Sequence, residues 1–86
     1  MQYALAHEAM RTYAFPADVL HEEDGTWSVV FPDLPGCVTW GTTQEEAIVN
    51  GQEAATLHLE GLREYGNAIP VPSATSPTQA TILVRA

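Results

Sequence analysis

The stretch Phe31-Pro32-Asp33-Leu34-Pro35-Gly36-Cys37 separates two alternating apolar segments and decides how the chain can fold. Its two prolines each fix φ and lack a backbone N–H donor, while Gly36 is able to adopt a positive φ. Such a segment cannot continue a β-ladder, so we expect a stiff turn that reverses the chain. Leu34 is flanked by prolines, and its apolar side chain should either fill the core or contact a partner.

Strands are expected on both sides of this turn. Residues 13–21 and 26–31 alternate between apolar and other residues, and residues 37–41 return as a third strand. The polar run Glu22-Glu23-Asp24-Gly25 predicts a hairpin between the first two strands. Pro16 cannot donate to a ladder, so an edge or a bulge is expected at that point. The pattern predicts a three-stranded antiparallel meander.

A long helix is predicted after the meander. Thr43 and Glu46 have the spacing of a capping box, and Gly66 is a natural residue to follow the helix end. Glu45 and Glu46 also favour the positive end of the helix dipole. Apolar or small residues recur at helical spacing and predict one inward stripe: Ala47, Ile48, Gly51, Ala54, Ala55, His58, Leu59 and Leu62.

The chain after the helix reads as an extended connection and a last strand. Residues 67–79 contain three prolines, and residues 81–84 are β-branched and apolar. The connection is long enough to place this strand parallel to another strand. The fold class is therefore α+β, in the order β-β-β-α-β. We expect one domain over residues 10–86, preceded by an N-terminal extension over residues 1–9.

Charge is the most informative part of the composition. Eleven acidic residues against three arginines, with no lysine, give a formal charge of −8 over 86 residues. A nucleic-acid binder needs cations to displace phosphate counterions, so direct nucleic-acid binding is not expected. An acidic surface suits a basic protein partner, although acidity alone also keeps a small protein soluble. The small core leaves apolar surface exposed, which favours a homodimer or higher homo-oligomer.

No catalytic or metal-binding constellation is found in the sequence. His7, His21 and His58 are far apart in the chain, and Cys37 has no partner at ligand spacing. Asp18 and a helical acid such as Glu53 could approach each other as in two-metal nucleases, but too few ligands accompany them. We therefore expect no cofactor, no metal and no enzymatic activity.

The location expected for this chain is the cytoplasm. A single cysteine fits a reducing compartment. No apolar run approaches the roughly 20 residues needed to span a bilayer, and the N-terminus lacks the pattern of a signal peptide.

Three motifs in order resemble the HicB antitoxin family of toxin–antitoxin systems. They are the turn at residues 31–37, the run Gly41-Thr42-Thr43-Gln44-Glu45-Glu46-Ala47 and the run Asn67-Ala68-Ile69-Pro70-Val71-Pro72, and the hairpin at residues 22–29 is similar as well. The resemblance implies a degenerate, partial RNase H-like fold whose last strand is parallel to the first. It also implies neutralisation of a small basic, RNA-cleaving toxin of the HicA type, and dimers or tetramers. The sequence stops after the last strand, so a short form without a C-terminal DNA-binding domain is expected.

Contact with the toxin is expected at the rigid turn and at the neighbouring acidic hairpin. The candidate residues are Glu22, Glu23, Asp24, Asp33, Leu34, Pro35 and Gly36. The alternative is that the turn only redirects the chain between two strands. A different reading of the whole protein is an oligomeric scaffold or small-molecule-binding module of the same fold without a toxin partner, and a residual metal-dependent nuclease is a remote third.

Overall fold

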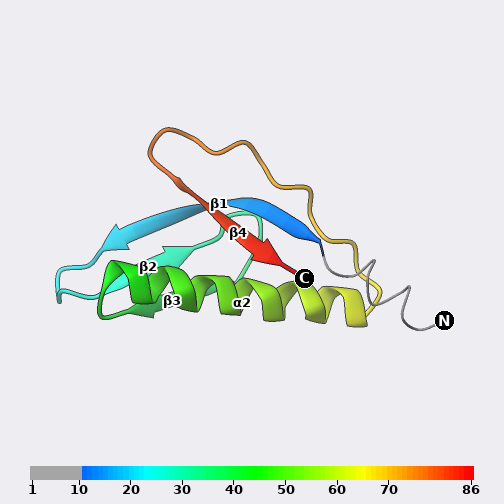
Figure 1. Ribbon diagram of the computed structural model, residues 1–86, viewed down its shortest axis with the longest axis horizontal. Helices are drawn as coiled ribbons and strands as arrows, with labels where there is room; N and C mark the ends of the chain where they lie inside the picture. Colours follow the sequence, from blue (N-terminus) through cyan, green and yellow to red (C-terminus); the bar gives the residue numbers. More distant parts are fainter. Residues whose placement is uncertain (1–10) are drawn as a thin grey trace.

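The computed structural model describes residues 11–86, which form a four-stranded sheet and one long helix (Figure 1). The expected β-β-β-α-β order and the α+β class are confirmed. The proposed extension at residues 1–9 lies outside the described residues. The elements are β1 (Thr12–His21), β2 (Trp27–Val30), β3 (Val38–Gly41), α2 (Gln44–Glu64) and β4 (Ala80–Arg85).

All neighbouring strands of the sheet are antiparallel, in the order β3-β2-β1-β4. The expectation that the last strand runs parallel to the first is wrong. β4 pairs antiparallel with β1, with Thr12 opposite Arg85 and Ala17 opposite Ala80. At this strand the sheet departs from the RNase H-like arrangement that the resemblance implies.

The direction of β4 follows from the path of the chain after the helix. α2 ends near the start of β1, because the Arg63 side chain donates to the Tyr13 hydroxyl at 3.4 Å. A strand that began directly after α2 would therefore run in the same direction as β1. Instead, the proline-containing residues 66–79 run back along the molecule before β4 begins (Figure 1). β4 then returns antiparallel to β1.

Pro16 lies within β1, which is an interior strand of the sheet. Arg11 and Ala86 exchange both N–H···O bonds across the β1–β4 pair. In an antiparallel ladder, successive residues turn their backbone N–H and C=O groups alternately toward and away from the neighbouring strand. The backbone nitrogen of Pro16 therefore points away from β4. On that other side, β2 pairs with β1 only from Asp18 onward. The sheet therefore loses no hydrogen bond at Pro16. At this residue β1 has no neighbour on the β2 side, so it is locally an edge, as expected.

The turn at residues 31–37 is closed by its own backbone and anchored by Leu34. The Leu34 N–H donates to the Phe31 carbonyl at 3.0 Å, and the Cys37 N–H donates to the Leu34 carbonyl at 2.9 Å. Gly36 has a φ of +83°, which a residue with a Cβ adopts only with strain. The Leu34 side chain is fully buried in the core. The core consists of Phe15, Ala17, Val29, Phe31, Leu34, Cys37, Ala47, Ala55, Leu59, Ile82, Val84 and Ala86.

Both ends of α2 have the caps that the sequence predicts. The Thr43 hydroxyl accepts from the Glu46 N–H at 3.1 Å. The Glu46 carboxylate accepts from the N–H and hydroxyl of Thr42, one residue before the expected capping-box partner. At the other end, the Gly66 N–H donates to the Arg63 carbonyl and the Asn67 N–H donates to the Leu62 carbonyl, three and five residues earlier, which is a Schellman motif.

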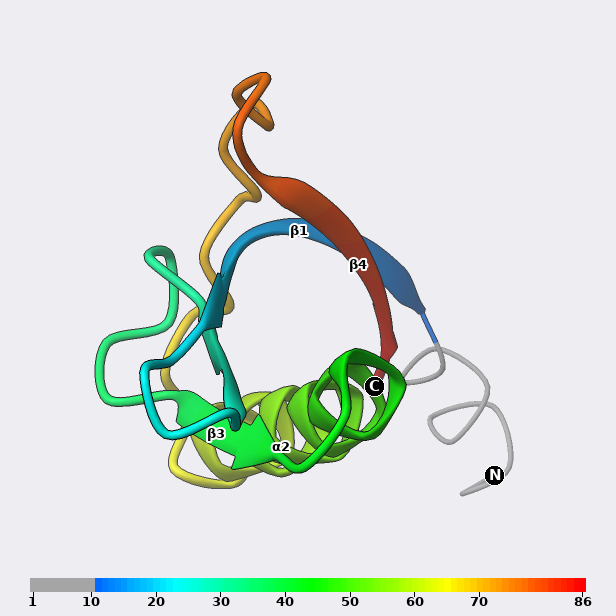
Figure 2. The same cartoon turned by 90° about the vertical axis from the view of Figure 1, so that its left-hand side faces the viewer.

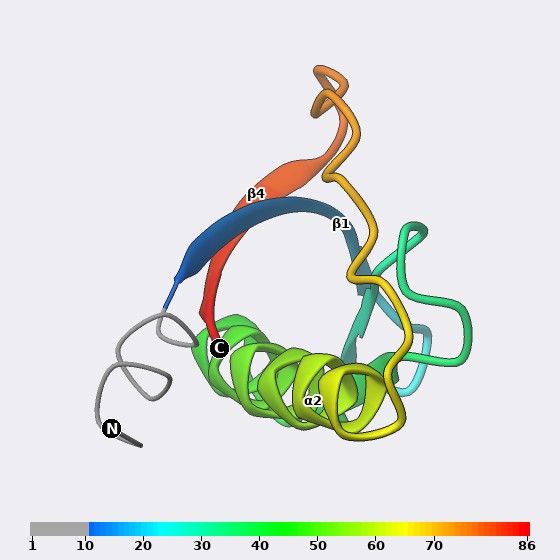
Figure 3. The same cartoon turned by 90° about the vertical axis from the view of Figure 1, so that its right-hand side faces the viewer.

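The sheet is strongly curved, and α2 lies between its two edge strands (Figures 2 and 3). The helix is bonded to both edges by side chains. Asn50 donates to the Trp40 carbonyl of β3 at 3.0 Å, and Gln52 donates to the Leu83 carbonyl of β4 at 3.1 Å. Thr56 donates to the Arg85 carbonyl at 3.2 Å. These bonds occupy carbonyl groups that edge strands otherwise leave open to pairing.

Candidate protein-binding surface

The two segments predicted to contact a partner lie at opposite ends of β2. The hairpin at residues 22–25 precedes β2, and the turn at residues 31–37 follows it (Figure 1). The structure therefore does not bring the acidic hairpin and the rigid turn into one cluster. Each must be considered by itself.

The hairpin carries three exposed carboxylates. The Asp24 carboxylate accepts from the hydroxyl and the N–H of Thr26, at 2.6 and 3.0 Å, and these bonds hold its pKa below the ordinary value. The Glu22 carboxylate accepts from the Ser28 hydroxyl at 2.6 Å. Glu23 makes no such bond within residues 11–86. The hairpin thus presents two carboxylates that hydrogen bonds hold in place, those of Asp24 and Glu22, and a solvated third carboxylate, that of Glu23.

The turn at residues 31–37 is fixed to the rest of the protein by the side chains of Asp33 and Leu34. The Asp33 carboxylate accepts from the N–H and hydroxyl of Ser73, at 2.7 and 2.8 Å, so it ties the turn to the connection before β4. Leu34 lies in the core and has no side-chain surface to offer a partner. Pro35 and Gly36 are exposed. Of the four turn residues predicted to contact a partner, these two remain accessible, and Asp33 is half-buried.

The face of the sheet turned away from α2 carries an apolar patch that was not predicted from the sequence. α2 packs on the face that carries Val29, since a Cβ added at Gly51 would stand 3.1 Å from the Val29 Cγ1. The opposite face carries the alternate residues of β1, β2 and β3. We call the following set the outer patch: Leu20, Ser28, Val30, Val38 and Trp40.

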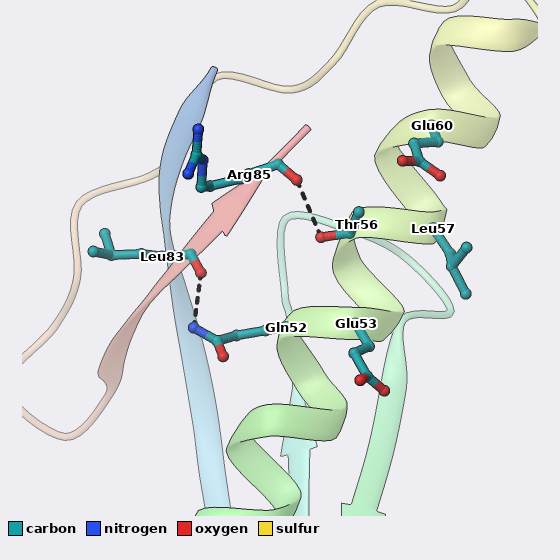
Figure 4. Close-up of a pocket in the computed structure, with 7 residues that line it drawn as sticks. All are labelled: Gln52, Glu53, Thr56, Leu57, Glu60, Leu83 and Arg85. Carbon is teal, nitrogen blue, oxygen red and sulfur yellow. Dashed lines mark hydrogen bonds between the residues drawn. The ribbon is translucent and has the colours of Figure 1, made fainter. Parts of the chain in front are cut away.

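A groove of about 600 Å³ lies between α2 and β4 (Figure 4). Its floor contains the two hydrogen bonds from the helix to the β4 carbonyls. Leu57 and Leu83 flank it, and both side chains are exposed. The charged side chains around it are of both signs, with Glu53 and Glu60 on the helix and Arg85 on the strand.

The described residues show no arrangement suited to metal-assisted catalysis. Within residues 11–86, no group of three His, Cys, Asp or Glu side chains could hold a metal ion. Asp18 accepts from Gln79 at 3.3 Å, whereas Glu53 lines the groove between α2 and β4. Burial raises the pKa of the Cys37 thiol, which disfavours the nucleophilic thiolate. No helix in this part of the chain is long and apolar enough to cross a membrane.

Comparison with known proteins gives concordant matches. Residues 15–82 match the family described as HicB_like antitoxin of bacterial toxin-antitoxin system. The chain is 38% identical over 60 residues to a UPF0150 protein of Thermoplasma acidophilum, covering 70% of this chain and 87% of that protein. It is 39% identical over 59 residues to Antitoxin HicB 2 of Photorhabdus laumondii, covering 69% of this chain and 42% of the antitoxin.

Solved structures of the Burkholderia pseudomallei antitoxin HicB are also similar. Its N-terminal domain matches with a TM-score of 0.65 and 30% identity, covering 83% of this chain and 94% of the domain. A structure of that antitoxin beyond the isolated domain matches with a TM-score of 0.67 and 31% identity, and this chain covers 61% of it. The chain thus spans nearly all of the N-terminal domain and less than half of the Photorhabdus antitoxin.

Proposed function

Because this chain belongs to the HicB-like antitoxin family of bacterial toxin–antitoxin systems, we propose that it binds and neutralises a small basic toxin of the HicA type. The role requires protein–protein contact and no catalytic step by this chain. Both partners would meet in the cytoplasm, where an RNA-cleaving toxin finds its substrate.

The distribution of charge is the observation that carries this proposal. The strand pairing across β1, β2 and β3 ends at Gly41, shortly before α2 begins. The hairpin acids Glu22, Glu23 and Asp24 therefore lie beside the first turn of α2. That turn carries Glu45 and Glu46. One end of the molecule is therefore strongly acidic. A basic partner would be attracted to that end by long-range steering, before any contact forms.

The three arginines lie at the other end of β1. Arg11 precedes the strand, Arg85 is opposite Thr12, and Arg63 donates to Tyr13. The ten residues of β1 separate the two ends by about 30 Å at the usual rise per residue. Within residues 11–86, no arginine therefore offsets the acids at the hairpin.

The proposal predicts a small basic protein encoded beside the gene, and co-production with that protein tests it. The toxin is produced with its catalytic residue inactivated, and a tag on one partner is used for recovery at low salt. We expect a stable complex, and we expect the active toxin to lose RNA cleavage when this chain is added. Recovery of the wild-type chain alone, with RNA cleavage unchanged, would contradict the proposed function and favour the oligomeric scaffold or small-molecule module.

We also propose that the chain forms a homodimer or higher homo-oligomer, through the groove between α2 and β4. The groove is flanked by Leu57 and Leu83 and has charges of both signs, so a second copy could place its Arg85 near a glutamate of the first. Light scattering of the wild-type chain at micromolar concentration should give the mass of a dimer, and Leu57→Glu should give that of a monomer. A monomeric wild-type chain at this concentration would contradict self-association, while leaving toxin binding open.

A further inference from the structure

The outer patch is a continuous, mainly apolar surface on the face of the sheet turned away from α2. The strand registers place Leu20, Ser28 and Trp40 in one row across the three strands, and Val30 and Val38 in the next row. Side chains directly opposite in such rows have Cβ atoms about 5 Å apart. The apolar members therefore form one surface around Ser28.

These side chains are more exposed than their chemistry favours. Leu20 is 50% exposed, Val38 is 58% exposed and Trp40 is 62% exposed. The only helix in the described part of the chain packs on the opposite face of the sheet. Contiguous exposed apolar side chains with a polar surround are typical of a binding surface, and tryptophan is the residue most enriched among interface hot spots.

Charge decides which partner fits the outer patch. Asp18 lies in the same row as Val30 and Val38, and Glu22 is bonded to Ser28 within the patch. Glu23 and Asp24 follow in the adjoining hairpin. All four neighbours are acids, and the three arginines of the chain lie at the far end of β1. A second copy would bring the same acids to the same face, and like charges would oppose it.

We propose that the outer patch docks a basic, apolar-centred surface of the toxin, with Trp40 as the main apolar contact and the hairpin acids as its charged rim. This inference rests on the proposed function and adds the surface that performs it. The charges around the groove beside α2 differ from those around the outer patch, because they include Arg85 as well as acids.

Substitutions on the two faces of the molecule test the inference. Trp40→Ala and Leu20→Ala remove apolar contact from the outer patch, and Val49→Ala removes a similarly exposed apolar side chain from α2, outside both the outer patch and the groove. Binding is measured by calorimetry with the catalytically inactive toxin. We expect Trp40→Ala to weaken binding at least about 30-fold, and Val49→Ala to change it less than about threefold. Circular dichroism and thermal melts verify that the variants fold.

Fluorescence gives a second readout that requires no loss of binding. In Trp27→Phe, Trp40 is the remaining tryptophan, and its emission should shift to shorter wavelength when the toxin is added. Toxin binding by the wild-type chain with unchanged affinity in Trp40→Ala would overturn the inference and leave the proposed function intact. Absence of binding by the wild-type chain would overturn both. A change from dimer to monomer caused by Trp40→Ala alone would assign the outer patch to a second copy and also overturn the inference.

Discussion

Leu34 gives the rigid turn its structural role. The residue lies between Asp33 and Pro35, two residues after Pro32, and its side chain is fully buried among aromatic and aliphatic core residues. The turn therefore does more than redirect the chain, because it supplies a core side chain between two strands. The same burial leaves the Leu34 side chain no surface for contact with a partner.

Truncation of Leu34 should destabilise the fold strongly. Leu34→Ala removes buried methyl groups and leaves a cavity, so we expect a loss of about 3 kcal/mol in the free energy of unfolding. Urea denaturation measures this change. Val49→Ala is the matched control, because the Val49 side chain is 51% exposed and lies outside the groove, and its removal should cost less than about 0.5 kcal/mol. Equal stability losses in the two variants would contradict the assigned role of Leu34.

Glu46 should make the stability of the helix start depend on pH. Its pKa lies below the ordinary value of 4.5, first because the Thr42 N–H donates to the carboxylate and second because the Thr42 hydroxyl does so. The folded state favours the charged carboxylate. The stabilisation from its bonds with Thr42 is therefore present above pH 4.5 and is lost as the pH falls through the lowered pKa of the folded state.

The measurement compares Glu46→Gln with the wild-type chain in urea between neutral and acidic pH. The stability difference between the two should be largest near neutral pH and should shrink in acid. Glu45→Gln removes the same charge from the first turn without removing the bonds to Thr42, so it is the control. A difference for Glu46→Gln that does not depend on pH would contradict this role of the carboxylate.

At the scale of the elements, the start of α2 is placed by its close approach to the end of β3. A Cβ added at Gly41 would stand 2.5 Å from the Ala47 nitrogen and 2.9 Å from the Ala47 Cα. These are backbone atoms of a capped helix, and they cannot move aside as easily as the end of a flexible side chain can. Gly41→Ala should therefore destabilise the protein by about 2 kcal/mol, measured by urea denaturation.

A second glycine provides the control for this prediction. Gly61 lies in the last turn of α2, and a Cβ added there meets no atom within 4 Å. Gly61→Ala should stabilise the helix by about 0.5 to 1 kcal/mol, because alanine has the higher helix propensity. The two substitutions are chemically identical and should have opposite signs. A stabilised Gly41→Ala variant would show that α2 can move away from β3 at little cost.

The sequence could predict every element, because each is determined by local chemistry. The turn prolines, the Thr43 cap and Gly66 mark boundaries that the structure reproduces within about two residues. It could not predict the direction of β4, since an extended connection of this length can deliver the next strand from either end of the sheet. That direction depends on where residues 66–79 run, which local patterns do not determine.

At the scale of the whole molecule, the candidate surface was only partly predictable. The acidic hairpin is evident from the run Glu22-Glu23-Asp24, whereas the outer patch is not. β2 carries apolar residues on both faces, and only the position of α2 decides which face is covered. Trp40 and Leu20 therefore appear as surface residues only once the helix is placed. Leu34 is the converse case, since burial removes it from the surface.

The separation of charge along the molecule should appear in the rate of toxin association. Glu23→Lys reverses a carboxylate at the acidic hairpin, and Glu64→Lys makes the same change of net charge at the end of α2, near the arginines. Charges at the rim of an interface act mainly on the association rate. At low salt, we expect Glu23→Lys to slow association about three- to tenfold and Glu64→Lys to change it much less.

Salt dependence separates this steering from a lost contact. At about 1 M salt the Debye length falls to about 3 Å, so the association rates of the two variants and the wild-type chain should converge. Stopped-flow fluorescence of Trp40 with the inactive toxin measures these rates. Equal slowing by both variants would mean that net charge alone governs the encounter, and the acidic end would then have no special role. A rate difference that persists at high salt would instead assign Glu23 to direct contact within the bound complex.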